Sequence, residues 1–123
     1  MKISFGPWTI APSQLFFESP LSFGLVNLKP LVQGHVLLIP KRCTPRFTEL
    51  TSEEVSDLFA SVQIVCRALE KAYPSSSDAF NIALQDGKHA GQSVPHVHVH
   101  VLPRKEKDFS NSDEVHKLIE TQR

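Results

Sequence analysis

The chain has 123 residues, of which 41% are hydrophobic and 21% charged, as expected for one globular domain over residues 1–123. Its 13 basic residues balance 13 acidic ones, so no overall charge attracts nucleic acid or an anionic membrane, and we expect neither DNA, RNA nor membrane partners. No segment approaches the roughly 18 consecutive apolar residues of a membrane span, and residues 1–7 lack the apolar run of a signal peptide.

Strand-forming segments, separated by prolines, occupy the first third of the chain. Residues 21–27 and 34–39 are each rich in side chains that favour strands, and each is followed by a turn or stop at a proline, Pro30 and Pro40. The connection between them is short enough for a hairpin with an irregular loop. We therefore expect two neighbouring antiparallel strands.

A helix is predicted to begin after Thr51 and to end before Pro74. Thr51 and Glu54 fit a capping box, in which each side chain bonds to the backbone N–H of the other. Apolar residues then recur at steps of three and four, which places them on one helical face: Val55, Leu58, Phe59, Val62, Val65, Cys66 and Leu69. This face is expected to pack against a sheet.

The second half of the chain alternates between strands and loops. Residues 79–85 are predicted to form a strand, residues 86–93 a glycine-bearing loop, and residues 95–102 another strand. Ser112–Glu120 is predicted to form a short helix with acidic residues in its first turn. The whole pattern predicts an α+β fold: an antiparallel β-sheet with one long helix packed on it and a short C-terminal helix.

Three histidines alternate with valines in the segment 95–102: His96, His98 and His100. Because side chains of a strand alternate between its faces, one face is expected to carry valines and the other three imidazoles. A solvent face is more simply built from Lys, Thr or Glu, so this pattern indicates chemistry. The strongest alternative is a coincidental polar face or a metal patch.

A single zinc ion fits this spacing poorly. Neighbouring histidines of a strand lie about 6.5–7 Å apart and the outer pair about 13 Å, whereas each zinc–nitrogen bond is roughly 2.0–2.1 Å. Two imidazoles can meet that requirement, but three can hardly converge from one straight strand, and no companion cysteine or paired carboxylate motif is present. We expect no metal site on the protein, and a metal-binding protein stays an alternative.

An extended phosphate ligand fits the row of imidazoles better. Neutral imidazole is a nucleophile near pH 7, and its attack on phosphorus gives a labile phosphoramidate. Gly87 and Gly91 in the preceding loop let the backbone approach a ligand closely, while Gln92 and Ser93 add neutral donors. These residues suggest phosphoryl or nucleotidyl transfer through a covalent histidine intermediate.

The surrounding sequence resembles a known family. Gln-Asp-Gly at 85–87 and Ala-Gly-Gln-Ser-Val-Pro-His-Val-His-Val-His-Val-Leu-Pro-Arg-Lys at 90–105 resemble the signature of the histidine triad (HIT) superfamily. The Leu-Pro-Arg-Lys ending and the later Asp108-Phe109 are most similar to its fragile histidine triad branch, the dinucleoside polyphosphate hydrolases. Upstream segments resemble that branch in order and spacing, so the similarity covers roughly residues 5–110.

The resemblance implies a role for four histidines. His98 matches the residue that attacks the α-phosphate and carries AMP covalently. His96 and His100 match the partners that orient the nucleophile and bind phosphate oxygens, with His100 as the direct phosphate contact. His35 matches a fourth histidine that supports the cluster from a neighbouring strand, whereas the residues alone favour a satisfied structural histidine.

The resemblance also implies the substrate contacts. Gln85 matches a residue near the bridging phosphates, Asn27 a ribose contact, and a loop around the phosphate is matched by Gly91, Gln92, Ser93 and Val94. Phe5 and Leu25 lie where the family builds its apolar adenine pocket. Trp8 stands near the nucleotide where the family often has histidine or tyrosine, and an indole can stack on a base but cannot accept a hydrogen bond as imidazole does.

The activity implied is that of a bis(5'-adenosyl)-triphosphatase-like hydrolase, which splits a dinucleotide substrate into AMP and a second nucleotide. A divalent cation, Mg²⁺ or Mn²⁺, is expected to accompany the substrate, and a homodimer is expected. The alternatives are a nucleoside phosphoramidate or adenylyl-sulfate hydrolase of the same superfamily, and a nucleotide-binding signalling module with slow turnover. The two cysteines, Cys43 and Cys66, are predicted to be reduced thiols, which predicts a cytoplasmic or nuclear location.

Overall fold

The computed structural model of the protein describes residues 3–28, 30–108 and 117–119. The strands are β1 (Ile3–Phe5), β2 (Trp8–Ile10), β3 (Leu15–Glu18), β4 (Ser22–Val26), β5 (Val36–Pro40), β6 (Ala79–Leu84) and β7 (Val99–Arg104). The long helix is α1 (Ser52–Ala72), and short 3₁₀ turns occupy Pro12–Gln14, Phe47–Glu49 and Lys88–Ala90. No described helix is both long and apolar enough to cross a bilayer.

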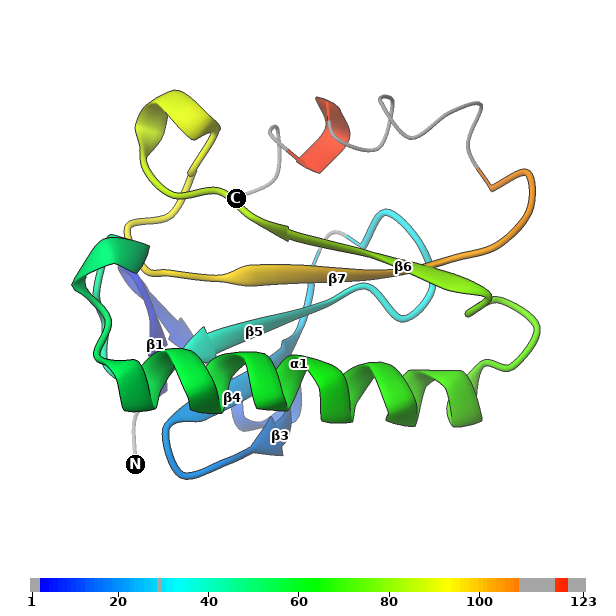
Figure 1. Cartoon of the computed structure of the whole chain (residues 1–123), viewed down its shortest axis with the longest axis horizontal. Helices are drawn as coiled ribbons and strands as arrows, with labels where there is room; N and C mark the ends of the chain where they lie inside the picture. Colours follow the sequence, from blue (N-terminus) through cyan, green and yellow to red (C-terminus); the bar gives the residue numbers. More distant parts are fainter. Residues whose placement is uncertain (1–2, 29, 109–116, 120–123) are drawn as a thin grey trace.

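The main sheet has five strands in the order β3-β4-β5-β7-β6, and every neighbouring pair is antiparallel. The helix α1 lies along this sheet, in front of it in Figure 1, and β1 and β2 form a separate two-stranded hairpin. The predicted α+β fold, an antiparallel sheet with one long helix on it, is confirmed.

The register defines two faces of the sheet. Val36, Val101 and Ile82 are aligned across β5, β7 and β6, and the next row is Leu37, His100 and Ala83. Since neighbouring residues of a strand point to opposite faces, the valine row and the histidine row lie on opposite sides. Each side has its own apolar cluster.

The valine side packs against α1. Its cluster joins helix residues to residues from β5 and the histidine segment: Val36, Leu38, Leu58, Val62, Val65, Leu69, Val97, Val99 and Val101. The other side packs against the β1–β2 hairpin: Ile3, Phe5, Ile10, Phe23, Leu25, Leu37, Ile39 and Val94. The histidine side is therefore covered as well, and the imidazoles do not face solvent as a polar strand surface would.

The predicted capping box of α1 is confirmed. Thr51 Oγ1 accepts from the Glu54 N–H at 3.1 Å, and Glu54 Oε1 accepts from the Thr51 N–H at 2.9 Å. Arg42 binds the same carboxylate through Nη2 at 2.7 Å and Nε at 3.0 Å. The hydrogen bonds from Arg42 have the largest effect on the Glu54 carboxylate, and together with that from the Thr51 N–H they lower its pKa to about 2. The helix start is thus tied to the end of β5.

Three local predictions were wrong or shifted. Phe59 was expected in the apolar face of α1, but it is 40% exposed and contacts the Phe47 ring edge-on at 6.2 Å. The strand expected at 95–102 begins only at Val99, because Val97 N–H bonds to the Thr44 carbonyl, outside the sheet. The strand expected at 34–39 begins at Val36, since Gly34 turns at φ +83°.

The predicted terminal helix Ser112–Glu120 falls mostly outside the described residues. Residues 117–119 are helical, and Ile119 is buried against Leu102.

Candidate functional site

The four histidines named from the sequence converge on one face of the sheet. The rings of His98 and His100 have their centres 5.2 Å apart, and those of His35 and His100 are 5.3 Å apart. All four are buried, with His98 only 2% exposed and His96 fully enclosed. The His98 ring is therefore almost entirely enclosed by the protein.

The backbone fixes the tautomer of His98. Its Nδ1 lies 2.8 Å from the carbonyl oxygen of His96. A carbonyl only accepts, so Nδ1 carries the proton and Nε2 keeps its lone pair. No hydrogen bond within the described part of the chain occupies this Nε2. His98 is thus a neutral imidazole whose Nε2 is available as a nucleophile.

A relay of hydrogen bonds fixes the tautomer of His100. The Leu31 N–H donates to His35 Nδ1 at 3.1 Å, so the proton of His35 lies on its Nε2. That Nε2–H donates to His100 Nδ1 at 3.0 Å, which leaves the His100 proton on Nε2. His100 therefore presents an N–H donor beside the lone pair of His98.

His96 has both ring nitrogens engaged. Its Nδ1 accepts from the Gly6 N–H at 3.0 Å, and its Nε2–H donates to the Pro40 carbonyl at 2.8 Å. The β1–β2 turn can come this close because Gly6 adopts φ +57° and a Cβ there would lie 2.7 Å from a methyl of Val94. His96 can therefore orient His98 through its carbonyl, but its ring has no nitrogen left for a phosphate in this arrangement.

Burial keeps the cluster uncharged. It lowers the pKa of His35 to about 4 and that of His100 to about 3, with the neighbouring imidazoles adding to the shift of His100. Burial also lowers the pKa of His96 and that of His98. All four are neutral at pH 7, so the site offers nucleophilicity and hydrogen bonding, without fixed positive charge from the imidazoles.

The predicted adenine-pocket residues lie beside the histidines. Phe5 is 1% exposed, with its ring edge-on to His98 at 5.1 Å and tilted to His96 at 5.6 Å. Leu25 packs in the same apolar cluster. Trp8 is directly opposite Phe5 in the hairpin and is 39% exposed. Asn27 is 5% exposed, and its side-chain amide lies 3.1 Å from His35 Nε2, next to the relay that ends at His100.

The predicted phosphate loop is held by its own glutamine. Gln92 Nε2 donates to the carbonyls of Pro45 at 2.7 Å and Val94 at 2.9 Å, and Gln92 Oε1 accepts from the Gly87 N–H at 2.7 Å. Both of its donors are used within the protein. Gln92, expected to donate to the ligand, therefore shapes the loop here.

The remaining predicted contacts lie at the ends of this loop. Gly91 takes the left-handed conformation at φ +93°, and Val94 is buried under Gly6. Ser93 is exposed. Gln85 follows β6 directly, and since Ala83 is aligned with His100, Gln85 belongs to the next position of the histidine face.

Sequence reasoning missed the groups that set the tautomers. These are backbone atoms of Gly6, Leu31, Pro40 and His96. Only the turn-forming glycine and the proline gave any signal in the sequence. It also missed the ion pair in which Arg46 binds Asp86 through Nε at 2.8 Å and Nη2 at 3.1 Å. In the described part of the chain, no group of three or more His, Cys, Asp or Glu side chains is arranged to hold a metal ion.

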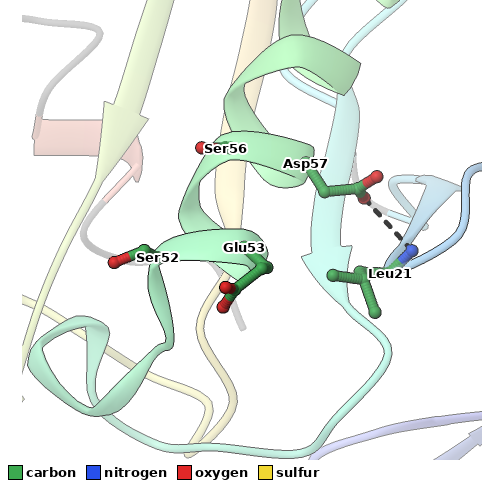
Figure 2. A pocket seen from close by; sticks show the side chains of 5 residues that line it. All are labelled: Leu21, Ser52, Glu53, Ser56 and Asp57. Atoms are coloured by element: carbon green, nitrogen blue, oxygen red, sulfur yellow. Dashed lines mark hydrogen bonds between the residues drawn. The ribbon is translucent and has the colours of Figure 1, made fainter.

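A separate hollow of about 510 Å³ lies at the start of α1 (Figure 2). It is lined by Leu21, Ser52, Glu53, Ser56 and Asp57. The Asp57 carboxylate is occupied by Ser22 Oγ at 2.6 Å and by the Leu21 N–H at 3.3 Å, so it joins the β3–β4 connection to the helix. This hollow contains no histidine, and the chemistry lies elsewhere.

Comparisons with known proteins match this arrangement. The family model of the HIT domain matches residues 9–107. The bis(5'-adenosyl)-triphosphatase of Dictyostelium discoideum is 50% identical over 119 residues, which are 97% of this chain and 78% of that protein. The bifunctional bis(5'-adenosyl)-triphosphatase/adenylylsulfatase FHIT of Arabidopsis thaliana is 48% identical over 117 residues, 95% of this chain and 64% of that protein. The crystal structure of Plasmodium falciparum diadenosine triphosphate hydrolase with cyclomarin A has a TM-score of 0.83 at 34% identity, covering 98% of this chain and 82% of that one.

Proposed function

This chain belongs to the HIT domain family, and we propose that it hydrolyses dinucleoside polyphosphates such as diadenosine triphosphate to AMP and a second nucleotide. The observation that carries the proposal is the pair of ring nitrogens described above: the free Nε2 of His98 beside the N–H of His100. The names of the Dictyostelium and Plasmodium proteins support the same substrate class.

The first step forms a covalent bond to His98. The lone pair of His98 Nε2 attacks the α-phosphorus, a P–N bond forms, and the P–O bond to the rest of the substrate breaks with its electron pair on the leaving oxygen. The ring becomes positively charged, and the His96 carbonyl, 2.8 Å from Nδ1, stabilises that charge. The N–H of His100 is placed to donate to a phosphate oxygen as charge develops there.

Water completes the reaction. Its oxygen bonds to phosphorus, the P–N bond breaks with its electron pair returning to His98 Nε2, and the proton of the water is released to solvent. AMP leaves and the neutral cluster is restored. Because every other imidazole is held neutral by burial, none of them competes as a charged acid at pH 7.

The substrate is taken as its Mg²⁺ or Mn²⁺ complex in this proposal. Only His98 among the four imidazoles has a free lone pair, because His35 and His96 use both ring nitrogens and the Nε2 of His100 carries a proton, so the cluster cannot chelate that ion. The ion therefore neutralises polyphosphate charge on the substrate. Chelation with EDTA is expected to lower AMP release, and added Mg²⁺ or Mn²⁺ to restore it.

The direct test follows AMP release from diadenosine triphosphate in Mg²⁺ by chromatography. Stoichiometric production of AMP and ADP supports the proposal. Tight nucleotide binding without AMP release contradicts it and favours the signalling module.

Adenylyl sulfate is a second candidate substrate, and the name of the Arabidopsis relative favours it. It offers the same α-phosphorus with sulfate as the leaving group, so the same His98 attack applies. Competition between the two substrates, measured as the ratio of kcat/KM values, decides which is preferred. Nucleoside phosphoramidates are compared in the same competition experiment.

A homodimer formed through the edge of the sheet is also part of the proposal. Strand β6 is the outer strand of the five-stranded sheet, and Ile82 on it is 51% exposed. A groove of about 380 Å³ between β6 and α1 is mainly apolar and includes Phe59, which is 40% exposed. Antiparallel pairing of two β6 strands would provide hydrogen-bond partners for the backbone groups at the outer edge of β6 and would cover Ile82 and Phe59.

We expect Ile82→Glu to convert the dimer to a monomer, because it places two carboxylates at the centre of the symmetric contact. Sedimentation velocity measures this directly. Phe16→Glu is the matched control, since Phe16 is 45% exposed and lies on β3, the opposite edge strand of the sheet. A wild-type monomer at micromolar concentration, or a dimer unaffected by Ile82→Glu, would contradict the proposed interface.

We propose the cytoplasm or nucleus as the compartment. Cys43 and Cys66 are both free thiols, and Cys43 is exposed. Burial raises the pKa of the Cys66 thiol, which keeps it protonated. Such thiols are typical of a reducing compartment.

A further inference from the structure

A groove beside the histidine site carries positive charge that the mechanism above does not use. It has a volume of about 380 Å³ and is lined in part by Arg46, Lys88, Ser93 and Pro95. Its lining includes residues 92–95, the segment that leads directly into His96 and His98. The groove and the histidines therefore share one continuous segment of backbone.

Arg46 and Lys88, the two cations of the groove, have N–H donors that no described group uses. Arg46 uses Nε and Nη2 to bind Asp86, which neutralises that carboxylate, and no described group bonds to its Nη1. The Arg46 side chain is 48% exposed. Lys88 is exposed, and no hydrogen bond or ion pair joins it to another described side chain. Asp86 neutralises Arg46, on which the Glu49 carboxylate also acts, so Lys88 is the cation of the groove that has no anionic partner among the described side chains.

The groove is held in one shape by bonds across it. Asp86 also accepts from the Phe47 N–H at 2.8 Å, so the loop is bound to the segment that carries Arg46. Gln92 bonds to the Pro45 carbonyl from the other side. A Cβ on Gly87, which has φ +97°, would lie 3.5 Å from the Arg46 guanidinium carbon, which shows how closely the loop backbone approaches the cation. Arg46 is therefore held in position before a ligand binds, and a preorganised cation stabilises charge without first having to reorganise.

We propose that this groove binds the phosphates of the leaving nucleotide, with Lys88 and the free edge of Arg46 as their cationic partners. This inference rests on the proposed hydrolysis of dinucleoside polyphosphates. When His98 attacks the α-phosphorus, the breaking P–O bond leaves its electron pair on the leaving nucleoside diphosphate, so negative charge grows on that side. Lys88 and Arg46 contact that charge more strongly in the transition state than in the ground state.

The test compares two substrates that share the AMP half. Diadenosine triphosphate releases a nucleoside diphosphate, whereas the p-nitrophenyl ester of AMP releases a group without phosphates. We expect Lys88→Gln to lower kcat/KM about fivefold for diadenosine triphosphate, and Lys88→Glu to lower it by at least about tenfold. The loss for the ester is expected to be several times smaller. Lys71→Gln, at an exposed position in the last turn of α1, is the control and should change neither substrate.

Salt provides a second readout that a structural defect would not give. The difference between wild type and Lys88→Glu on diadenosine triphosphate should shrink as ionic strength rises, because exposed charges are screened. Equal losses for both substrates, or no loss for either, would overturn the groove assignment while leaving the hydrolysis proposal intact. If wild type releases no AMP from diadenosine triphosphate but cleaves the ester, the dinucleotide proposal itself fails.

Discussion

Replacing His98 by asparagine is expected to lower kcat for diadenosine triphosphate by about 10⁴-fold or more. The reason is that no other ring in the cluster has a free lone pair: His96 uses both nitrogens, and the Nε2 of His100 carries a proton. Asparagine can still donate to the His96 carbonyl and occupies a similar space. Nucleotide binding should therefore change much less than kcat, which single-turnover AMP release and equilibrium binding can separate.

His89→Asn is the matched control for this variant. His89 lies in the 3₁₀ turn of the loop and is exposed, and nothing in the described structure connects it to the cluster. Its kcat should stay within about twofold of wild type. A His98→Asn enzyme that keeps more than about a tenth of wild-type turnover would show that another group attacks phosphorus.

The second large effect is a loss of stability in mild acid. His35 and His100 have pKa values lowered to about 4 and about 3 in the folded protein, against 6.5 as the ordinary value. Below pH 6.5 the unfolded chain therefore binds more protons than the folded one, and the free energy of unfolding falls as the pH falls. Each of the two contributes about 1.4 kcal/mol per pH unit, so together about 5 kcal/mol is lost between about pH 6.5 and about pH 4.5.

Urea denaturation at a series of pH values measures this slope. Carboxylates do not account for it, because Glu54, with a pKa lowered to about 2, loses its contribution only below its ordinary value of 4.5. A His35→Gln variant should be less stable than wild type near pH 7. The difference should shrink as the pH falls, because the variant lacks one of the groups that bind a proton on unfolding. A free energy of unfolding that is flat between about pH 6.5 and about pH 5 would show that the imidazoles are not held neutral.

Local patterns predicted the elements that depend on neighbouring residues. The capping box of Thr51 and Glu54 needs only residues three apart, and it forms as expected. The alternation of histidine and valine also correctly separates two faces, since Val97, Val99 and Val101 pack with α1. Both patterns depend only on residues within a few positions of one another, so they can be recognised from the sequence alone.

Contacts between residues far apart in the sequence determine where β7 begins and which part of the α1 apolar face is buried. The strand β7 begins at Val99 because the backbone of Val97 bonds to Thr44, far back in the chain. Phe59 follows the apolar period of α1, yet it is 40% exposed, and its ring meets that of Phe47 at a right angle with 6.2 Å between the ring centres. Residues at helical spacing predict a face, but the neighbouring elements determine which part of it is buried.

The separate roles of the histidines could be predicted only in part from the sequence. The resemblance to the family distinguished His98 from its neighbours, but the residues themselves are chemically identical. Their roles follow from which backbone group each ring meets: the Gly6 N–H at His96, the His96 carbonyl at His98, and the relay from Leu31 at His100. These partners carry no side-chain signature, and two of them lie on other elements.

The most direct test of the central claim is the identification of the covalent intermediate by mass spectrometry. Enzyme mixed with excess diadenosine triphosphate is quenched in alkali, where a phosphoramidate survives, and the peptide containing the three histidines is sequenced. One added adenylyl group is expected on His98, and none in His98→Asn. An adenylyl group on another residue, or turnover with no adduct during the steady state, would contradict it.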